Sequence, residues 1–182
     1  MNGLYPLRFA AAAVTLWWFR RKYLTLEWRA SWIAPAAGIL VFILWIAMDR
    51  TGTPAADATP ADLTAASSWA RALWIVIRVL AGAVTVPIAE ELAFRGYLLR
   101  RLVSADFESV QPQFSFWIAL LISSIIFGLL HGNRWFAGTV AGVVYGLIYM
   151  RRGRIVEAIL AHGVTNALLA VDVLAFHHWH QW

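Results

Sequence analysis

Two adjacent glutamates, Glu90 and Glu91, stand in a strongly apolar part of the sequence and are followed by Arg95. A charged side chain inside a bilayer is costly, so ionisable groups in such segments usually face the interior of a helical bundle and have a function. If residues 87–101 form a helix, Glu91 and Arg95 lie four residues apart on one face and can form an ion pair. Glu90 is rotated by about 100° from Glu91 and points elsewhere. The pattern therefore predicts one carboxylate that the arginine neutralises and one that is free for chemistry.

Two further apolar stretches carry isolated polar side chains at helical spacing. His131 follows Phe127 by four residues in IIFGLLHGN, and Asn166 follows His162 by four residues in AILAHGVTNALLA. Each pair therefore shares one helix face. We interpret Phe127 as a packing residue at the wall of a cavity, and the two histidines and the asparagine as candidate site residues.

A carboxylate, two imidazoles and an amide suit the attack of water on a peptide carbonyl. Glu90 could act as the general base, with His131 orienting the water. His162 and Asn166 could donate hydrogen bonds to the developing oxyanion. The sequence has no cysteine, and no serine or threonine stands in an obvious nucleophile context, so we do not expect a covalent acyl-enzyme.

The elements that would position these residues are membrane helices. The 182 residues are 61% hydrophobic and 14% charged, and the mean hydropathy is +0.65, which is too apolar for a soluble domain. Eleven tryptophans suit the two interfaces of a bilayer. The net charge of +5 comes mainly from arginines at segment ends, which indicates membrane topology rather than nucleic-acid binding.

Six apolar segments approach the roughly 20 residues that cross a bilayer, and lipid forces each to satisfy its backbone hydrogen bonds as a helix. They run from Leu4 to Phe19, Trp32 to Met48, Ala72 to Ala89, Phe114 to Leu130, Trp135 to Met150 and Ile155 to Phe176. We predict an all-α fold, a polytopic membrane helical bundle of about six transmembrane helices with a polar intramembrane cavity. We interpret residues 1–182 as a single integral membrane domain whose motif-bearing core covers about residues 72–176. Gly138, Gly142 and Gly146 repeat every fourth residue, which predicts a close helix–helix contact.

The charge of the connections predicts the orientation. Basic residues follow the first, third and fifth segments, whereas the connection after the second is rich in proline and glycine and mildly acidic. By the positive-inside rule the three basic connections are cytoplasmic and both termini lie outside. We expect an integral protein of a bacterial inner membrane whose cavity opens toward the cytoplasm.

In order, spacing and location, the three motifs resemble those of the CAAX protease and bacteriocin-processing (CPBP) family, intramembrane endopeptidases that include the type II CAAX prenyl proteases. The motifs are Glu90-Glu91-x-x-x-Arg95, Phe127-x-x-x-His131 and His162-x-x-x-Asn166. The resemblance covers about half of the chain, from Pro87 to Ala170. The opening stretch LYPLRFAAAAVTLWWFRRKY also resembles small relatives associated with bacterial exosortase systems.

This resemblance implies an α-helical membrane fold with a cavity and a glutamate-dependent, metal-independent mechanism without a cofactor. The residues that match Glu90 and His131 activate water in that family. Those that match His162 and Asn166 stabilise the transition state, and those that match Glu91 and Arg95 form a structural pair. The substrate would be a protein or peptide at the membrane.

Two other classes of function stay open. Glu90, His131 and His162 could instead bind zinc, with water completing a tetrahedron. The same groups could form a proton relay or ion path in a small transporter, or belong to a non-catalytic scaffold or immunity protein, because fold does not fix function. The oligomeric state stays open, and we assign no role to Arg78. We interpret the C-terminal HHWHQW as an interfacial end.

Overall fold

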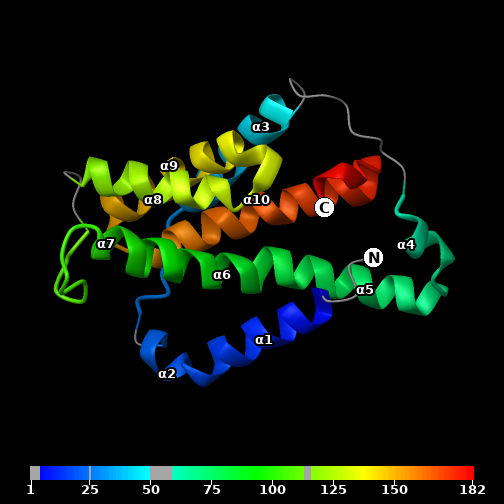
Figure 1. Cartoon of the computed structure of the whole chain (residues 1–182), viewed down its shortest axis with the longest axis horizontal. Helices are drawn as coiled ribbons and strands as arrows, with labels where there is room; N and C mark the ends of the chain where they lie inside the picture. Colours follow the sequence, from blue (N-terminus) through cyan, green and yellow to red (C-terminus); the bar gives the residue numbers. More distant parts are fainter. Residues whose placement is uncertain (1–4, 25, 50–58, 113–115) are drawn as a thin grey trace.

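The computed structural model describes residues 5–24, 26–49, 59–112 and 116–182. These residues contain helices and no β-strand, which confirms the all-α prediction. Successive long helices run in alternating directions along the bundle (Figure 1). They are α1 (Tyr5–Trp18), α3 (Ile33–Asp49), the continuous helix Ser68–Arg101, α8 (Trp117–Leu129), α9 (Trp135–Arg152) and α10 (Ile155–Phe176). Short helices lie in the connections: α2 (Arg20–Tyr23), α4 (Ala61–Ala65), η3 (Gly132–Arg134) and η4 (Trp179–Gln181).

The helix Ser68–Arg101 corrects the third predicted segment, which we expected to end at Ala89. The helix continues through the charged stretch because Glu91 and Arg95 neutralise each other on one helix face. The sixth predicted segment coincides with α10, and the second and fifth agree with α3 and α9 to within two residues. The first and fourth predicted segments begin outside the described residues.

Two wide turns interrupt this long helix. It consists of α5 (Ser68–Leu80), the π-helical η1 (Ala81–Thr85), α6 (Val86–Glu91), the π-helical η2 (Leu92–Leu98) and α7 (Leu99–Arg101). Ser67 caps its start, where the side chain accepts a hydrogen bond from the Ala70 amide. Pro87, the second residue of α6, has no amide hydrogen to donate, so the backbone hydrogen-bond ladder is incomplete at this point. Single π turns inside α-helices occur frequently at functional sites.

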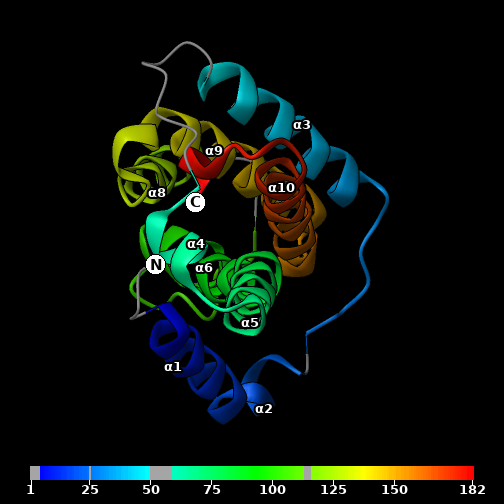
Figure 2. The same cartoon turned by 90° about the vertical axis from the view of Figure 1, so that its right-hand side faces the viewer.

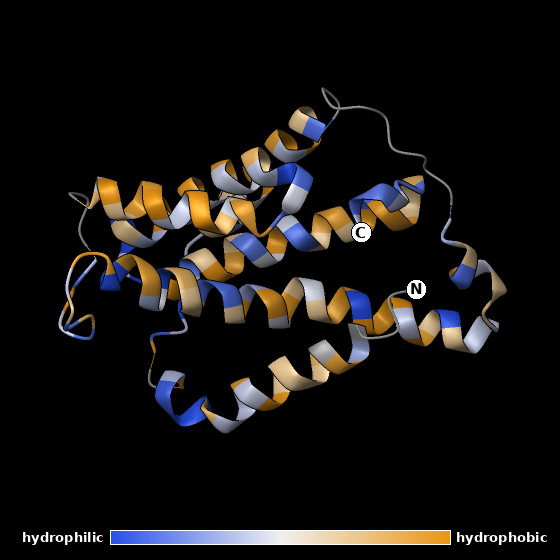
Figure 3. Cartoon of the chain, viewed as in Figure 1, coloured by the Kyte–Doolittle hydropathy of each residue, from blue (hydrophilic) through white to orange (hydrophobic). Residues whose placement is uncertain are grey.

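The apolar surface of the bundle fits a lipid environment. The helix Ser68–Arg101 and α10 are long and apolar enough to cross a membrane, and α3, α8 and part of α1 are apolar but shorter. In the most apolar stretch of each long helix, only 17% of the residues in Ser68–Arg101 and 33% of those in α10 are buried inside the protein. The core helix of a soluble domain would be mostly buried. On α8, Ile118 is 76% exposed and Leu129 is 61% exposed, and hydrophobic residues recur along the helices of the bundle (Figure 3). The protein is therefore a membrane helical bundle, while the number of six spans stays a prediction.

The glycine stripe of α9 permits the close contact that its spacing predicts. A Cβ atom on Gly138 would lie 3.0 Å from the Cα atom of Gly128, and one on Gly142 would lie 3.1 Å from the Cα atom of Ser124. A Cβ atom on Gly146 would overlap Leu120, also on α8. Helix α9 also contacts α3 and α10 and lies among its neighbours in the view along the bundle (Figure 2). Because other helices surround α9, it needs less apolar side-chain surface than helices that face lipid.

The basic connections gather at one end of the bundle, where α2, α7 and the turn between α9 and α10 lie (Figure 1). Buried Glu157 organises this end: it accepts hydrogen bonds from the Ser31 amide at 3.1 Å and from Arg154 at 2.6 Å. At the opposite end, Asp49 pairs with Arg134 at 2.7 Å and contacts His180 at 2.7 Å. The two ends thus differ in charge, as the sequence indicates.

Candidate active site

Glu91 lies at the centre of a buried polar cluster. Its Oε1 atom accepts a hydrogen bond from Nη1 of Arg95 at 3.1 Å, and the two side chains are 0% and 1% exposed. The same oxygen lies 2.9 Å from Nδ1 of His162 on α10. Arg95 also donates to the carbonyl of Gly142 on α9 at 2.7 Å. The ion pair that the i, i+4 spacing predicts is present, but Glu91 contacts a candidate site histidine as well.

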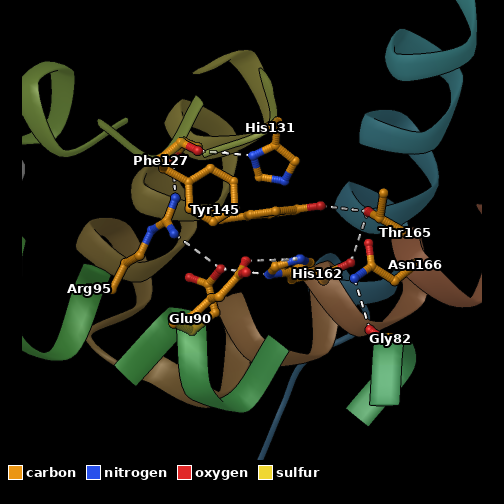
Figure 4. Close-up of polar contacts among 12 residues, drawn as sticks. Gly82, Glu90, Arg95, Phe127, His131, Tyr145, His162, Thr165 and Asn166 are labelled. Atoms are coloured by element: carbon orange, nitrogen blue, oxygen red, sulfur yellow. Dashed lines mark hydrogen bonds and ion pairs between the residues drawn. The ribbon is translucent and has the colours of Figure 1, made fainter. Parts of the chain in front are cut away.

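Glu90 points in a different direction from Arg95 and retains partial access. Its side chain is 30% exposed, and its Oε2 atom lies 3.9 Å from Nε2 of His162. His162 therefore faces both adjacent glutamates, with Nδ1 toward Glu91 and Nε2 toward Glu90, and Figure 4 shows its ring beside Glu90. The distance of 3.9 Å is too long for a direct hydrogen bond.

Aromatic rings hold the His162 imidazole from two sides. The Tyr145 ring stacks on it at 4.9 Å with an interplanar angle of 16°, and the Phe127 ring meets it edge-on at 5.8 Å. The Tyr145 hydroxyl donates to Oγ1 of Thr165 at 2.8 Å, and Thr165 in turn donates to the Gly38 carbonyl on α3. The sequence analysis did not identify Tyr145 or Thr165. The position of Tyr145 between two glycines of the α9 stripe and the helical spacing of Thr165 from His162 are the signals that could have found them.

The Asn166 side chain donates a hydrogen bond to the backbone of the long helix. Its Nδ2 atom donates to the Gly82 carbonyl at 2.8 Å. In a π turn this carbonyl would accept from the amide five residues later, which is the position of Pro87, and proline has no amide hydrogen. The neighbouring π bond, from Val86 to Ala81, is present. Asn166 therefore supplies the donor that Pro87 lacks, and its amide nitrogen keeps a second hydrogen for another acceptor.

His131 lies at the turn between α8 and α9 (Figure 4). Its Nδ1 atom is 2.9 Å from the Phe127 carbonyl, which can only accept, so this nitrogen carries the hydrogen. Its ring packs against Phe127 at 4.9 Å and edge-on against Trp45 at 5.5 Å. Although His131 and Glu90 are far apart in the sequence, the fold brings both to the surroundings of His162 (Figure 4).

His131, His162, Asn166 and Phe127 all line one cavity of about 180 Å³. Its other walls include Trp45, Arg78, Gln181 and Trp182. The cavity therefore extends toward the end of the bundle that holds the C-terminal segment, away from the basic connections (Figure 1). A separate pocket, lined by Lys22, Arg100 and Tyr149 among others, lies at the basic end, and the expected opening toward the cytoplasm stays a prediction. Helix crossing, which the sequence does not reveal, decides where the space remains.

The described residues contain no group of three or more His, Asp or Glu side chains arranged to hold a metal ion. Glu90 and His162 approach each other, and the bond from Nδ1 of His131 to a backbone carbonyl leaves its Nε2 atom able to ligate. The zinc alternative therefore stays a hypothesis for experiment.

Comparisons with known proteins agree with the motifs. The family model described as "Type II CAAX prenyl endopeptidase Rce1-like" matches residues 72–168, more than half of the chain. The chain belongs to the Rce1-like family. All three motifs lie inside the matched residues, which confirms the family predicted from the sequence. The family also supports the assignment as an integral membrane protein with a protease fold.

A similar protein of known sequence is also named as a membrane peptidase. The Bacillus subtilis (strain 168) protein named "Putative membrane peptidase YdiL" is 27% identical over 99 residues. These residues are 53% of this chain and 37% of that protein, so the chain matches little more than a third of its relative's length. No solved structure matches the chain.

Proposed function

We propose that this protein is an intramembrane endopeptidase that hydrolyses a peptide bond with a water molecule activated by Glu90. One observation carries the proposal within the Rce1-like family: His162 lines a cavity and faces the adjacent carboxylates of Glu90 and Glu91, with one ring nitrogen toward each. Glu91 is engaged by Arg95 and His162, whereas Glu90 is partly exposed. Glu90 does not itself line the cavity, but it lies 3.9 Å from His162, which does. Of the two carboxylates it is therefore the one better placed to take a proton from water.

In the proposed reaction, Glu90 takes a proton from water while the water oxygen bonds to the scissile carbonyl carbon. His131 presents its Nε2 atom to the water as an acceptor, because Nδ1 is occupied at the Phe127 carbonyl. His162 and the second amide hydrogen of Asn166 donate to the oxyanion. When the C–N bond breaks, Glu90 returns its proton to the leaving amine. The mechanism uses neither a covalent intermediate nor a cofactor.

The substrate in this proposal is a protein or peptide segment at the membrane. A CAAX-type peptide is the first class to test because it is the substrate class named by the family. The resemblance of the first helix to exosortase-associated relatives makes protein maturation at a bacterial inner membrane the second. With the basic end of the bundle on the cytoplasmic side, both termini lie outside the cytoplasm.

The decisive experiment compares wild type with Glu90→Gln and His131→Ala in nanodiscs, using quenched fluorescent CAAX-type peptides with and without a prenyl group. Removing a general base lowers the rate by about 10²–10⁴-fold, and we expect this loss for Glu90→Gln. Glu108→Gln, at an exposed carboxylate in the loop after α7, is the matched control and should keep full activity. Full activity of folded Glu90→Gln protein would refute the mechanism.

The same preparation tests the alternatives. Elemental analysis and treatment with 1,10-phenanthroline test the zinc hydrolase, which requires stoichiometric metal and loss of activity on chelation. The non-enzymatic functions are tested in host membranes that contain either the wild-type protein or Glu90→Gln. A protease creates new termini in its substrate proteins, so the termini are compared between the two membranes. Identical termini in both membranes, together with no peptide cleavage, would favour a scaffold or transport role.

A further inference from the structure

The hydrogen bond at one nitrogen of His162 determines what the other nitrogen can do. A carboxylate only accepts hydrogen bonds, and Glu91 is held as a carboxylate by its ion pair with Arg95. The contact of 2.9 Å between Glu91 and His162 therefore places a hydrogen on Nδ1. In a neutral imidazole, Nε2 would then have no hydrogen and could only accept. His162 can donate from Nε2 to an oxyanion only if both ring nitrogens are protonated.

The charges around His162 favour this doubly protonated form. The long helix supplies two carboxylates, Glu90 and Glu91, and one guanidinium, Arg95. With a neutral His162 the cluster carries a net negative charge in the middle of an apolar bundle; with an imidazolium its two positive and two negative groups balance. A surplus charge is expensive in such surroundings. The Oε2 atoms of both glutamates are buried and have no hydrogen-bond partner among the described residues, so protein donors do not offset that surplus.

The aromatic residues from the other helices act in the same direction. Tyr145 on α9 stacks nearly parallel to the imidazole, and Phe127 on α8 lies at its edge. The face of a tyrosine ring is negative and attracts a cation. Its hydroxyl is fixed by Thr165, so the stack holds the plane of the ring as well. Two further ionisable groups line the same cavity as His162: His131 contacts Phe127 and Trp45, and Arg78 lies against the rings of Trp74 and Trp182.

We infer that His162 is an imidazolium, held by Glu91 and Tyr145 with its Nε2–H group on the side of Glu90. Glu91 and Tyr145 are then positioning residues, because they act on the reaction through His162. This inference deepens the proposed function and rests on it for the role of the Nε2–H group. It divides the chemistry between the adjacent glutamates: Glu90 takes the proton from water, and Glu91 keeps the neighbouring histidine charged.

The protonation state is measured directly by NMR of the full protein in detergent micelles, labelled with ¹⁵N in its histidines, near pH 7. The variant His162→Gln identifies the His162 signals among the five histidines. We expect both ring nitrogens of His162 to carry hydrogen. A ring nitrogen without hydrogen in the wild-type protein would overturn the inference.

The NMR measurement needs no substrate, so the imidazolium inference and the protease function can be refuted independently of each other. If both nitrogens are protonated and no peptide is cleaved, the imidazolium stands and the protease function falls. If peptides are cleaved and His162 is neutral, the protease stands and the imidazolium falls.

Variants test the two positioning residues. In Glu91→Gln we expect one ring nitrogen of His162 to lose its hydrogen and kcat to fall by about 10²-fold, the loss typical for one oxyanion donor, with little change in KM. Because Glu91→Gln also removes a buried charge, Tyr145→Leu provides a second test that keeps both carboxylates. It should move the high-pH limit of kcat/KM to lower pH, whereas Tyr145→Phe, which keeps the stacked ring, should retain most of the wild-type profile.

Tyr149→Phe is the matched control, because Tyr149 is also a buried tyrosine of α9 and follows Tyr145 by one helical turn. It should leave both the NMR signals and the pH profile unchanged. If Tyr145→Leu gives the same signals and profile as Tyr149→Phe, Tyr145 is a packing residue and its positioning role is refuted.

Discussion

We expect the substitution of glutamate by glutamine to destabilise the protein at Glu91 but hardly at Glu90. Glu91 is 0% exposed, and its partner Arg95 is 1% exposed. Breaking a buried ion pair by removing one partner costs about 3–5 kcal/mol, because the other charge stays buried and uncompensated. Glutamine keeps one oxygen as an acceptor, and Arg95 keeps its bond to the Gly142 carbonyl, so we expect the lower end, about 3 kcal/mol.

Glu90 gives the contrasting result. Its side chain is 30% exposed and its nearest charged neighbour, His162, is 3.9 Å away. At this distance Glu90 makes no direct hydrogen bond to His162, so Glu90→Gln breaks none, and the cluster stays neutral when His162 gives up one proton. We therefore expect a cost of about 1 kcal/mol. Glu90→Gln should therefore unfold close to the wild-type temperature while it loses peptide hydrolysis.

Thermal unfolding in one detergent, followed by the fluorescence of the eleven tryptophans, measures the difference. For a chain of this size, 1 kcal/mol corresponds to about 2–4 °C in Tm. We expect Glu91→Gln to lower Tm by about 6–12 °C and Glu90→Gln by less than about 4 °C. Glu108→Gln controls for the loss of an exposed charge. Equal shifts for the two adjacent substitutions would refute the assignment of Glu91 as the buried, paired carboxylate.

Two further predictions concern helix contacts. Gly38→Ala should destabilise the protein by about 1–3 kcal/mol, because its Cβ atom would lie 2.8 Å from Cβ of Val164. Gly82→Ala is the control, because no atom lies within 4 Å of a Cβ atom at that position. Equal Tm values for the two variants would contradict the close contact at Gly38. Asn166→Ala should cost about 1–3 kcal/mol by leaving the Gly82 carbonyl without a donor, but less in a Pro87→Ala background, where a backbone amide can replace it. A double-mutant cycle of unfolding free energies measures this coupling, and strict additivity would exclude it.

The sequence by itself determined the local features of this protein. The six apolar segments, the Glu91–Arg95 pair and the glycine stripe of α9 follow from helical spacing and hydropathy, which depend on residues only a few positions apart. The order of the three motifs was enough to identify the family. The apolar pattern marked the third segment only to Ala89, and the helix continues to Arg101 because Glu91 and Arg95 pair at i, i+4 spacing, as expected if residues 87–101 are helical.

The tertiary structure decided how the motifs combine. Glu91 meets His162, Asn166 meets Gly82, and Tyr145 stacks on His162 across helices that are far apart in the sequence. The cavity extends toward the C-terminal segment rather than toward the basic connections. None of these contacts follows from periodicity, which fixes the face of a residue on its own helix but not the rotation and crossing of that helix against its neighbours. Rotation and crossing depend on how all the side chains of the bundle pack together, so the partners of each polar group appear only in the folded protein.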